Sequence, residues 1–356
     1  MNARVAAVLV VLLAVLGGGA LLMQQQDRAR RPAAADLLGQ PVVKDLQAAD
    51  IAAIVIREPG ATLTLQRRDA RWTIAERAGF AADVEQVRQL VLAVLALKVG
   101  SSEPIGDKDR ARLKLDGSGA QLEFRGADGK ALATLVVGKK YFKREPENAD
   151  RASGDGRFVL LPATSSTAYV VADPLALATA KSASWIDKTG FGAEKVRSME
   201  VDHVGSGKWR IERTGDNAEW KLTPLYAGEK LDVIRANSAS YSLNRVQIAD
   251  VAAPSVRRED TGLDKPVTVV ASTFDGLTYT LKLGKPRGED YYATLWMSGV
   301  PKVTGADAAE RAKQIAERLP HEKALAGQVL LIARSKFEDV LKKRSELLEK
   351  KDPGKK

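Results

Sequence analysis

An internal repeat constrains the fold of this chain more than any other feature of its sequence. Three landmarks recur at a nearly constant offset. They are Trp72 and Trp220 at 148 residues, Leu115-Asp116 and Leu263-Asp264 at 148, and Val137-Gly138-Lys139 and Leu283-Gly284-Lys285 at 146. A constant offset between landmarks so far apart predicts a duplicated domain.

Each copy reads as a set of short strands with one main helix. The alternating or apolar runs in the first copy are 51–56, 63–67, 72–74, 121–124, 132–137, 157–161 and 169–171, and in the second 196–201, 209–213, 220–222, 267–271, 279–283, 291–297 and 329–332. Asp128-Gly129 and Asp275-Gly276 predict hairpin turns. The connections are too short for repeated helical crossovers, so we expect antiparallel sheets, each with a helix on one face, in an α+β fold.

The predicted helices differ in the strength of their apolar stripes. Asp83, with Gln86 three residues later, has the pattern of a capping box before the Val/Leu-rich run 84–97. Asp232 opens the equivalent helix, whose weaker stripe would consist of Ile234, Ser238 and Tyr241. A short polar helix or turn is expected between Pro104 and Leu115, and further helices at 174–182, 306–319 and, as an amphipathic closing helix, 337–348.

The N-terminal segment predicts a membrane anchor. Residues 5–23 contain no charge, and a helix of that length spans about 28 Å, close to the hydrocarbon thickness of a bilayer. We therefore expect residues 1–27 to form a cytoplasmic stub and transmembrane anchor and 28–44 a linker. The copies follow at 45–192 and, with the C-terminal helices, at 193–356. Because arginines flank the apolar run on both sides, charge alone does not set its orientation.

Composition excludes several kinds of chemistry. The chain has no cysteine, so it contains no disulfide or thiolate site. Its net charge of +10 comes mostly from the two ends: residues 1–31 hold four basic residues against one acidic residue, and residues 334–356 hold nine against five. A nucleic-acid-binding domain concentrates positive charge on a folded face, so this distribution argues against such a partner.

The landmarks together resemble a bacterial family known as domain of unknown function 4340. The matching pieces are the apolar N-terminus, the strands at 54–56 and 63–65 before Trp72, the helix after Asp83, Leu115-Asp116, Val137-Gly138-Lys139, and Tyr169-Val170-Val171 followed by Trp185-Ile186-Asp187-Lys188. The resemblance covers roughly residues 1–300. It implies a single-pass protein of the bacterial inner membrane with its main domain in the periplasm, and a companion role to ABC transport systems of the gliding type. It assigns no functional residue.

No constellation in the sequence predicts catalysis, a metal or a cofactor. His203 and His321 are the only histidines, and both are interpreted as surface residues. Asp116 and Asp264 could form a pair of acids, but Asp at such positions ordinarily closes a turn by accepting backbone N–H bonds. Trp72 and Trp220 could stack on a sugar, although a tryptophan following a tight turn is more often a core anchor. The basic groups at 342–344 and 350–351 could touch anionic lipid or remain solvated.

Three functions remain open at this point. The favoured one is an accessory or scaffold protein that acts by protein contact, with ABC transporter subunits as the implied partners, and not as an enzyme. The alternative is a binding module for a cell-wall glycan or small ligand in the cleft between the two copies. An enzyme using acidic residues is the third.

Overall fold

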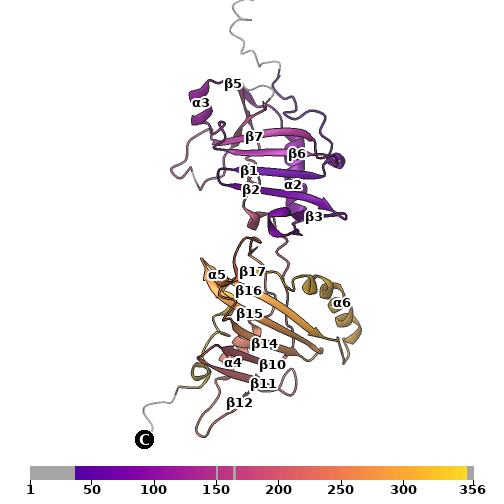
Figure 1. Cartoon of the computed structure of the whole chain (residues 1–356), viewed down its shortest axis with the longest axis vertical. Helices are drawn as coiled ribbons and strands as arrows, with labels where there is room; N and C mark the ends of the chain where they lie inside the picture. Colours follow the sequence, from indigo (N-terminus) through magenta and orange to yellow (C-terminus); the bar gives the residue numbers. More distant parts are fainter. Residues whose placement is uncertain (1–36, 150, 163–165, 351–356) are drawn as a thin grey trace, which may run out of the picture. The chain divides into compact units, whose positions relative to one another are not determined.

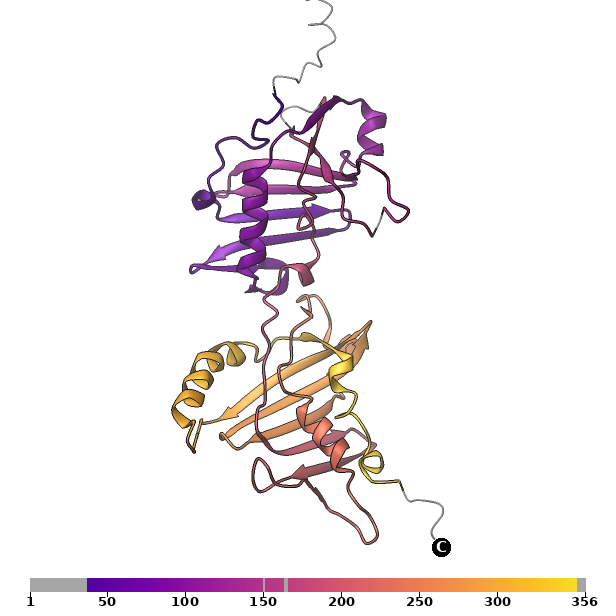
Figure 2. The same cartoon turned by 180° about the vertical axis from the view of Figure 1, so that it is seen from behind.

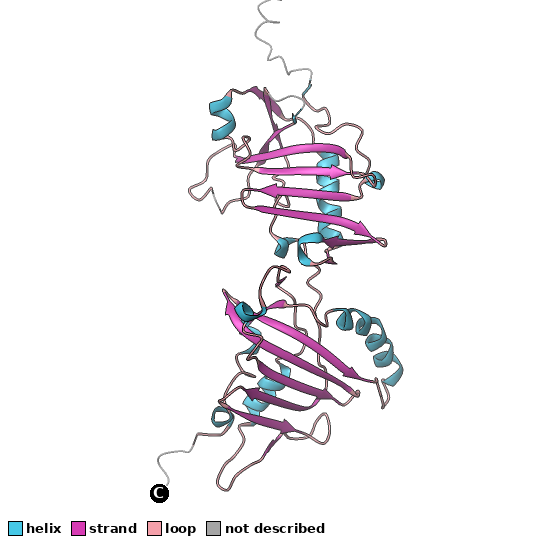
Figure 3. Cartoon of the chain, viewed as in Figure 1, coloured by secondary structure: helices cyan, strands magenta, loops and turns pink. Residues whose placement is uncertain are grey.

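The computed structural model describes residues 37–149, 151–162 and 166–350. The predicted anchor, the stub and most of the linker lie outside these residues. Within the described part, no helix is long and apolar enough to cross a membrane. The strands form two sheets, and helices make up a smaller part of the described chain (Figure 3). Contacts divide the chain into two compact units: one holds the described residues through Thr62 with Arg88–Ala180, and the other holds Leu63–Val87 with Lys181 onward.

The first sheet has nine antiparallel strands in the order β4-β3-β2-β1-β6-β7-β8-β9-β5. Its strands are β1 (Ala53–Glu58), β2 (Ala61–Arg68), β3 (Arg71–Ile74), β4 (Phe80–Ala81), β5 (Ser101–Pro104), β6 (Ala120–Arg125), β7 (Ala131–Tyr141), β8 (Gly156–Leu160) and β9 (Thr167–Val171). Its helices are α2 (Val84–Ala96) and α3 (Asp107–Arg112).

The second sheet has eight antiparallel strands in the order β12-β11-β10-β14-β15-β16-β17-β13. Its strands are β10 (Val196–His203), β11 (Gly207–Glu212), β12 (Lys221–Thr223), β13 (Asp250–Val251), β14 (Val267–Thr273), β15 (Leu277–Arg287), β16 (Asp290–Gly299) and β17 (Leu330–Ala333). Its helices are α4 (Val233–Tyr241), α5 (Arg258–Thr261) and α6 (Ala308–Ala324). Apart from β4, which has no equivalent in the second sheet, equivalent strands occur in the same order in both sheets. The predicted α+β class is confirmed.

Helix α2 forms as the sequence predicts. The Asp83 carboxylate accepts hydrogen bonds from the backbone N–H groups of Glu85 and Gln86, at 2.9 and 3.3 Å, which caps the helix. The stripe that contains Val87 and Leu90 is buried, and the helix lies across one face of the first sheet (Figure 2). Alternate residues of a strand point to opposite faces of the sheet. Leu135 and Val137 of β7 therefore share one face, and both are buried in the core under α2.

Helix α4 begins at the predicted N-cap, but the predicted apolar stripe is wrong. The Asp232 carboxylate caps the helix through the N–H groups of Ile234 and Arg235. Ile234 and Tyr241 are exposed, at 78% and 62%, whereas Ala236, Ala239 and Ser240 are buried. Small residues let the helix backbone lie close to the sheet, so burial follows the alanines and not the larger side chains.

Two other predicted helices are absent. Residues 174–182 form turns ending in a 3₁₀ turn, η5 (Ser182–Ser184), because the Glu58 carboxylate accepts from the Ala180 N–H at 2.7 Å and the Thr179 hydroxyl at 3.1 Å. Residues 337–348 follow the 3₁₀ turn η6 (Arg334–Phe337) as irregular turns and contain one further 3₁₀ turn, η7 (Arg344–Leu347).

Tertiary hydrogen bonds explain the loss of the predicted closing helix. The Lys342 carbonyl accepts from the Trp209 indole N–H, and the Leu347 carbonyl accepts from the Asp232 N–H, both at 2.8 Å. Because these two carbonyl groups accept hydrogen bonds from distant residues, they do not form the hydrogen bonds of a helix. The extra helix predicted at 306–319 is confirmed as α6, which continues past Pro320 to Ala324. The strands β4, β5 and β13 and the helix α5 were not predicted.

Candidate functional site

The outer face of the first sheet, opposite α2, carries an apolar cluster. It consists of the buried residues Ile105, Leu113, Leu115, Leu160 and Ala168, with Val136 and Phe158 packed against them. We call this the α3 cluster, because Ile105, Leu113 and Leu115 flank α3. These side chains fill the space between the α3 segment and strands β7–β9.

The second sheet has an equivalent place, which close backbone contacts identify. At Gly138 of β7 an added Cβ would collide with the Leu113 carbonyl oxygen, and at Gly284 of β15 it would collide with the Thr261 carbonyl oxygen. The strand register agrees, because Val136 pairs with Leu160 in the first sheet and Lys282 pairs with Thr294 in the second. The α5 segment therefore occupies the position of the α3 segment, and α5 lies on the face away from α4 (Figures 1 and 2).

The residues at the equivalent positions are mostly polar in the second sheet. Thr261 stands for Leu113, Lys282 for Val136, Tyr292 for Phe158 and Thr294 for Leu160, while Leu263 keeps the place of Leu115. Instead of a filled cluster, the second sheet has a hollow of about 660 Å³. Its lining consists of Val256, Arg258, Thr261, Leu263, Thr280, Lys282, Thr294, Leu295, Trp296, Gly327 and Val329. We call this the β15–β16 hollow.

Trp296 gives the β15–β16 hollow an aromatic wall. It lies on β16 directly opposite Thr280 of β15 and is 63% exposed, although large aromatic side chains usually bury their area. In the first sheet the same register places Pro162, two residues beyond the end of β8, at the equivalent position. Trp296 was not predicted from the sequence. The available signal was strand alternation, since Leu295 faces the core and Trp296 must therefore face outward.

The hollow has the size and composition of a small-ligand site. Such sites measure about 300–1,000 Å³ and combine apolar walls with a few placed polar groups. Here Trp296, Leu263 and Val329 supply apolar surface, and Thr280 and Thr294 supply hydroxyl groups. The lining contains no histidine, serine or carboxylate, and its polar side chains are threonines, Arg258 and Lys282.

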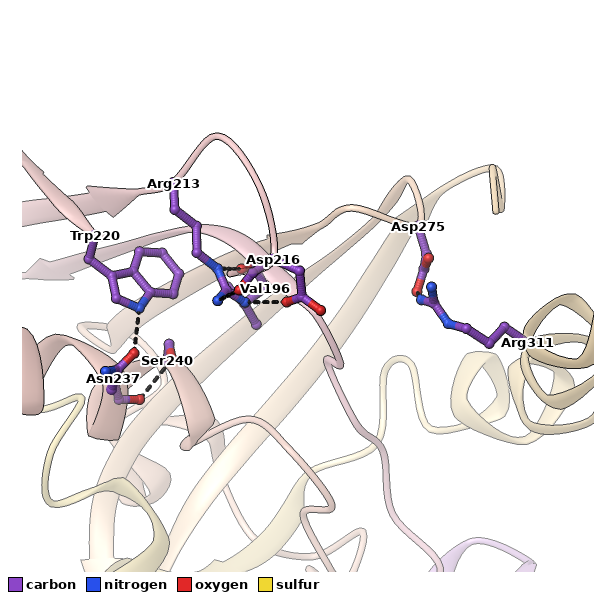
Figure 4. A network of polar contacts seen from close by, with 8 residues as sticks. All are labelled: Val196, Arg213, Asp216, Trp220, Asn237, Ser240, Asp275 and Arg311. Atoms are coloured by element: carbon purple, nitrogen blue, oxygen red, sulfur yellow. Dashed lines mark hydrogen bonds and ion pairs between the residues drawn. The ribbon is translucent and has the colours of Figure 1, made fainter. Parts of the chain in front are cut away.

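Trp220 is a core anchor, as the sequence analysis favoured. It is buried, its indole N–H donates to the Asn237 side-chain oxygen at 2.8 Å, and the Arg213 guanidinium lies 4.6 Å from its ring centroid (Figure 4). Arg213 is held in turn by the Val196 carbonyl and by Asp216, both at 2.8 Å. Trp72, its counterpart on β3, is half-buried.

The two aspartates named as a conceivable acid pair both lie in turns. The Asp116 carboxylate accepts hydrogen bonds from the Ser118 hydroxyl at 2.6 Å and from the Ser118 N–H at 3.2 Å. These bonds lower the pKa of Asp116. Asp264 is exposed in the turn after α5.

The histidines and the basic tail stand apart from the hollow. His203 ends β10, and His321 contacts the Thr189 carbonyl oxygen at 2.8 Å. Among the described residues no group of three or more His, Asp or Glu could hold a metal ion. In the tail, Lys342 pairs with Asp339 and Arg344 with Glu229, while Lys351 lies outside the described residues.

A buried polar network holds α6 and was not predicted from the sequence. The Glu322 carboxylate accepts from the Tyr279 hydroxyl at 3.0 Å, the Gly192 N–H at 3.0 Å and Arg318 at 2.7 Å. Burial, assisted by the charge of Glu322, raises the pKa of Tyr279. A second contact joins Arg311 of α6 to Asp275 in the turn before β15 (Figure 4). Every polar atom of the Glu322 carboxylate is thus used, which fits a structural role.

The comparison with protein families identifies the class of this chain. The family model described as "Domain of unknown function (DUF4340)" matches residues 72–266, more than half of the chain. The chain belongs to this family, as the resemblance in its sequence predicted. A comparison with curated proteins and one with solved structures found no match.

Proposed function

We propose that this chain is a membrane-anchored binding module on the outer side of the bacterial inner membrane, built from two tandem copies of one α+β unit. The second copy would bind a hydroxylated ring, such as a sugar unit of the cell wall, in the β15–β16 hollow. The observation that carries this proposal is the contrast between the copies: the place that the first fills with the α3 cluster is open and polar in the second.

The geometry supports a sugar because each part of a pyranose would meet a suitable group. The C–H face of the ring is apolar and slightly positive, and it would stack on the electron-rich face of Trp296. Hydroxyl groups at the ring edge would exchange hydrogen bonds with Thr280 and Thr294, which accept and donate. This location within one copy replaces the cleft between copies that the sequence suggested.

The anchor and location support the same role. The uncharged run of residues 5–23 would hold the protein at the membrane, with the two copies in the periplasm beside the cell wall. Carbonate extraction of membranes and protease treatment of spheroplasts would test this part. Retention in the pellet together with cleavage of the folded part from outside is expected, and a protected folded part would contradict it.

Binding itself can be tested with the detergent-solubilised full chain and soluble cell-wall fragments. We expect wild-type protein to retain fragments and Trp296→Ala to lose at least about tenfold in affinity, because the stacking surface is removed. Tyr241→Ala is the matched control, since Tyr241 is equally exposed but lies on α4. Equal binding by wild type and Trp296→Ala would contradict the proposal.

An accessory role through protein contact is the second candidate. The loop from β12 to α4 and the first turn of α4 expose Leu225, Tyr226, Val233 and Ile234, and clustered exposed apolar residues mark interaction surfaces. The partners implied by the family resemblance are ABC transporter subunits. A pull-down from solubilised membranes, compared with an Ile234→Asp variant, should enrich permease or ATPase subunits with the wild type only. Recovery of the wild-type protein without them would contradict a stable complex.

A further inference from the structure

We propose that the ligand of the β15–β16 hollow is an anionic saccharide, bound through its carboxylate or phosphate by Arg258 and Lys282. This inference rests on the proposed function and adds the charge of the ligand to it. The observation behind it is that the ion pairs around the hollow differ from those at the equivalent place in the first copy.

The charged residues that line the hollow have one sign. Arg258 and Lys282 are both exposed cations, and no carboxylate lines the hollow. Among the described residues neither cation has an ion pair, although ion pairs are frequent on this surface. Two positive groups in a lining that holds no carboxylate favour a negatively charged ligand.

The first copy shows the equivalent arginine beside the filled α3 cluster. Arg110 of α3 is the counterpart of Arg258, and its Nε atom lies 3.8 Å from the Asp107 carboxylate. The counterpart of Asp107 is Ser255, so the second copy lacks this acidic partner. Val136, the counterpart of Lys282, carries no charge.

The acidic residues beside Arg258 are engaged elsewhere. Glu259 and Asp260 of α5 both pair with Arg257, at 2.7 and 2.9 Å. Hydrogen bonding from Arg257 lowers the pKa of Asp260. Arg257 thus neutralises these carboxylates and leaves Arg258 for a ligand. An arginine can hold a carboxylate or phosphate through two parallel N–H bonds, while lysine adds a point charge.

The test uses the solubilised full chain and sugars that differ in charge. N-acetylmuramic acid is N-acetylglucosamine with an added carboxylate, and N-acetylglucosamine 6-phosphate carries the charge as a phosphate. We expect one charged sugar to bind at least about tenfold more tightly than the neutral sugar. Which of the two binds more tightly identifies the source of the charge. The preference should decrease at high salt.

Variants locate the preference. Lys282→Met and Arg258→Met should each reduce the preference for the charged sugar without weakening the neutral sugar. Lys221→Met, at an exposed lysine on β12, should leave the preference unchanged. Equal binding of charged and neutral sugars would overturn the inference but keep the binding module. If no sugar binds, the inference and the proposed binding function both fail.

Discussion

The outer faces of the two sheets solve the same structural problem in different ways. In the first sheet, Leu113 and Leu160 close the space under α3 with apolar contacts. In the second, Thr261 and Thr294 stand at the same places and leave a hollow beside Trp296. Apolar packing stabilises the first copy at this point, whereas the second copy gives up that packing and gains a polar-lined surface. Under the proposed function, the first copy would be a scaffold and the second would carry the site.

The largest effect on stability should come from replacing the repeated tryptophans, Trp220 and Trp72. These substitutions test whether the two residues contribute differently to the stability of their copies. Trp220→Ala should destabilise the second unit by about 3–5 kcal/mol, because it opens a cavity and leaves Asn237 without its donor. Trp72→Ala should cost roughly half as much, since Trp72 is half-buried. Chemical denaturation of each variant measures the free energies of unfolding. Equal losses would break this part of the comparison.

Exchanging residues between the two outer faces should give the next largest effect. Leu160→Thr should destabilise the protein by about 2–4 kcal/mol, because it removes buried apolar volume and buries a hydroxyl group. The reciprocal change, Thr294→Leu, should alter stability by less than about 1 kcal/mol, since Thr294 borders open space. Thermal unfolding of both variants measures the asymmetry, and similar losses would show that the second site is also packed.

Trp296→Ala should affect stability least among the aromatic variants. Its ring is mostly exposed, so we expect a change within about 0.5 kcal/mol, although the same variant should lose ligand. Denaturant titration measures the first quantity and fragment binding the second. A loss of several kcal/mol would instead identify Trp296 as a structural residue.

The smallest effect concerns the two turn aspartates and depends on pH. The Ser118 hydroxyl and N–H bonds lower the pKa of Asp116 in the folded state, below the value of about 3.9 expected for an unfolded chain. Their stabilisation is therefore present above about pH 4 and is lost as the pH falls through the folded-state pKa. Asp116→Ala should lower the melting temperature slightly at pH 6, and this loss should become smaller as the pH falls below about 4.

Asp264→Ala provides the control for that experiment. Asp264 is exposed. Within the described residues, its carboxylate accepts no hydrogen bond from the other residues of its turn. We expect Asp264→Ala to lower the melting temperature at pH 6 by less than Asp116→Ala does. A pH-dependent loss of equal size in both variants would mean that the turns are equivalent after all.

Local patterns in the sequence predicted the regular parts of the fold. Alternation located most strands, the two Asp-Gly turns placed hairpins that the structure contains, and Asp83 and Asp232 cap the expected helices. The failures occur where distant groups compete for the backbone. Glu58 holds residues 179–180, and Trp209 and Asp232 hold the closing segment, so neither becomes the predicted helix.

The candidate site was less predictable for a related reason. The repeat was visible, but its functional content lies in differences between aligned positions, such as Lys282 for Val136 and Thr294 for Leu160. Those differences acquire meaning only when the strand register shows that the positions share one outer face. Trp72 and Trp220 attracted attention because they repeat, whereas Trp296 has a proline, Pro162, at the equivalent position of the first copy.

The most direct test of the central claim is a ligand titration of a filled second copy. The double variant Lys282→Val and Thr294→Leu gives the β15–β16 hollow two residues of the α3 cluster, those at Val136 and Leu160. Calorimetric titration of wild type and variant with cell-wall fragments compares their affinities, and thermal unfolding verifies that the variant is folded. We predict a folded variant that no longer binds fragments retained by the wild type. A folded variant with unchanged affinity would show that the hollow is not the binding site.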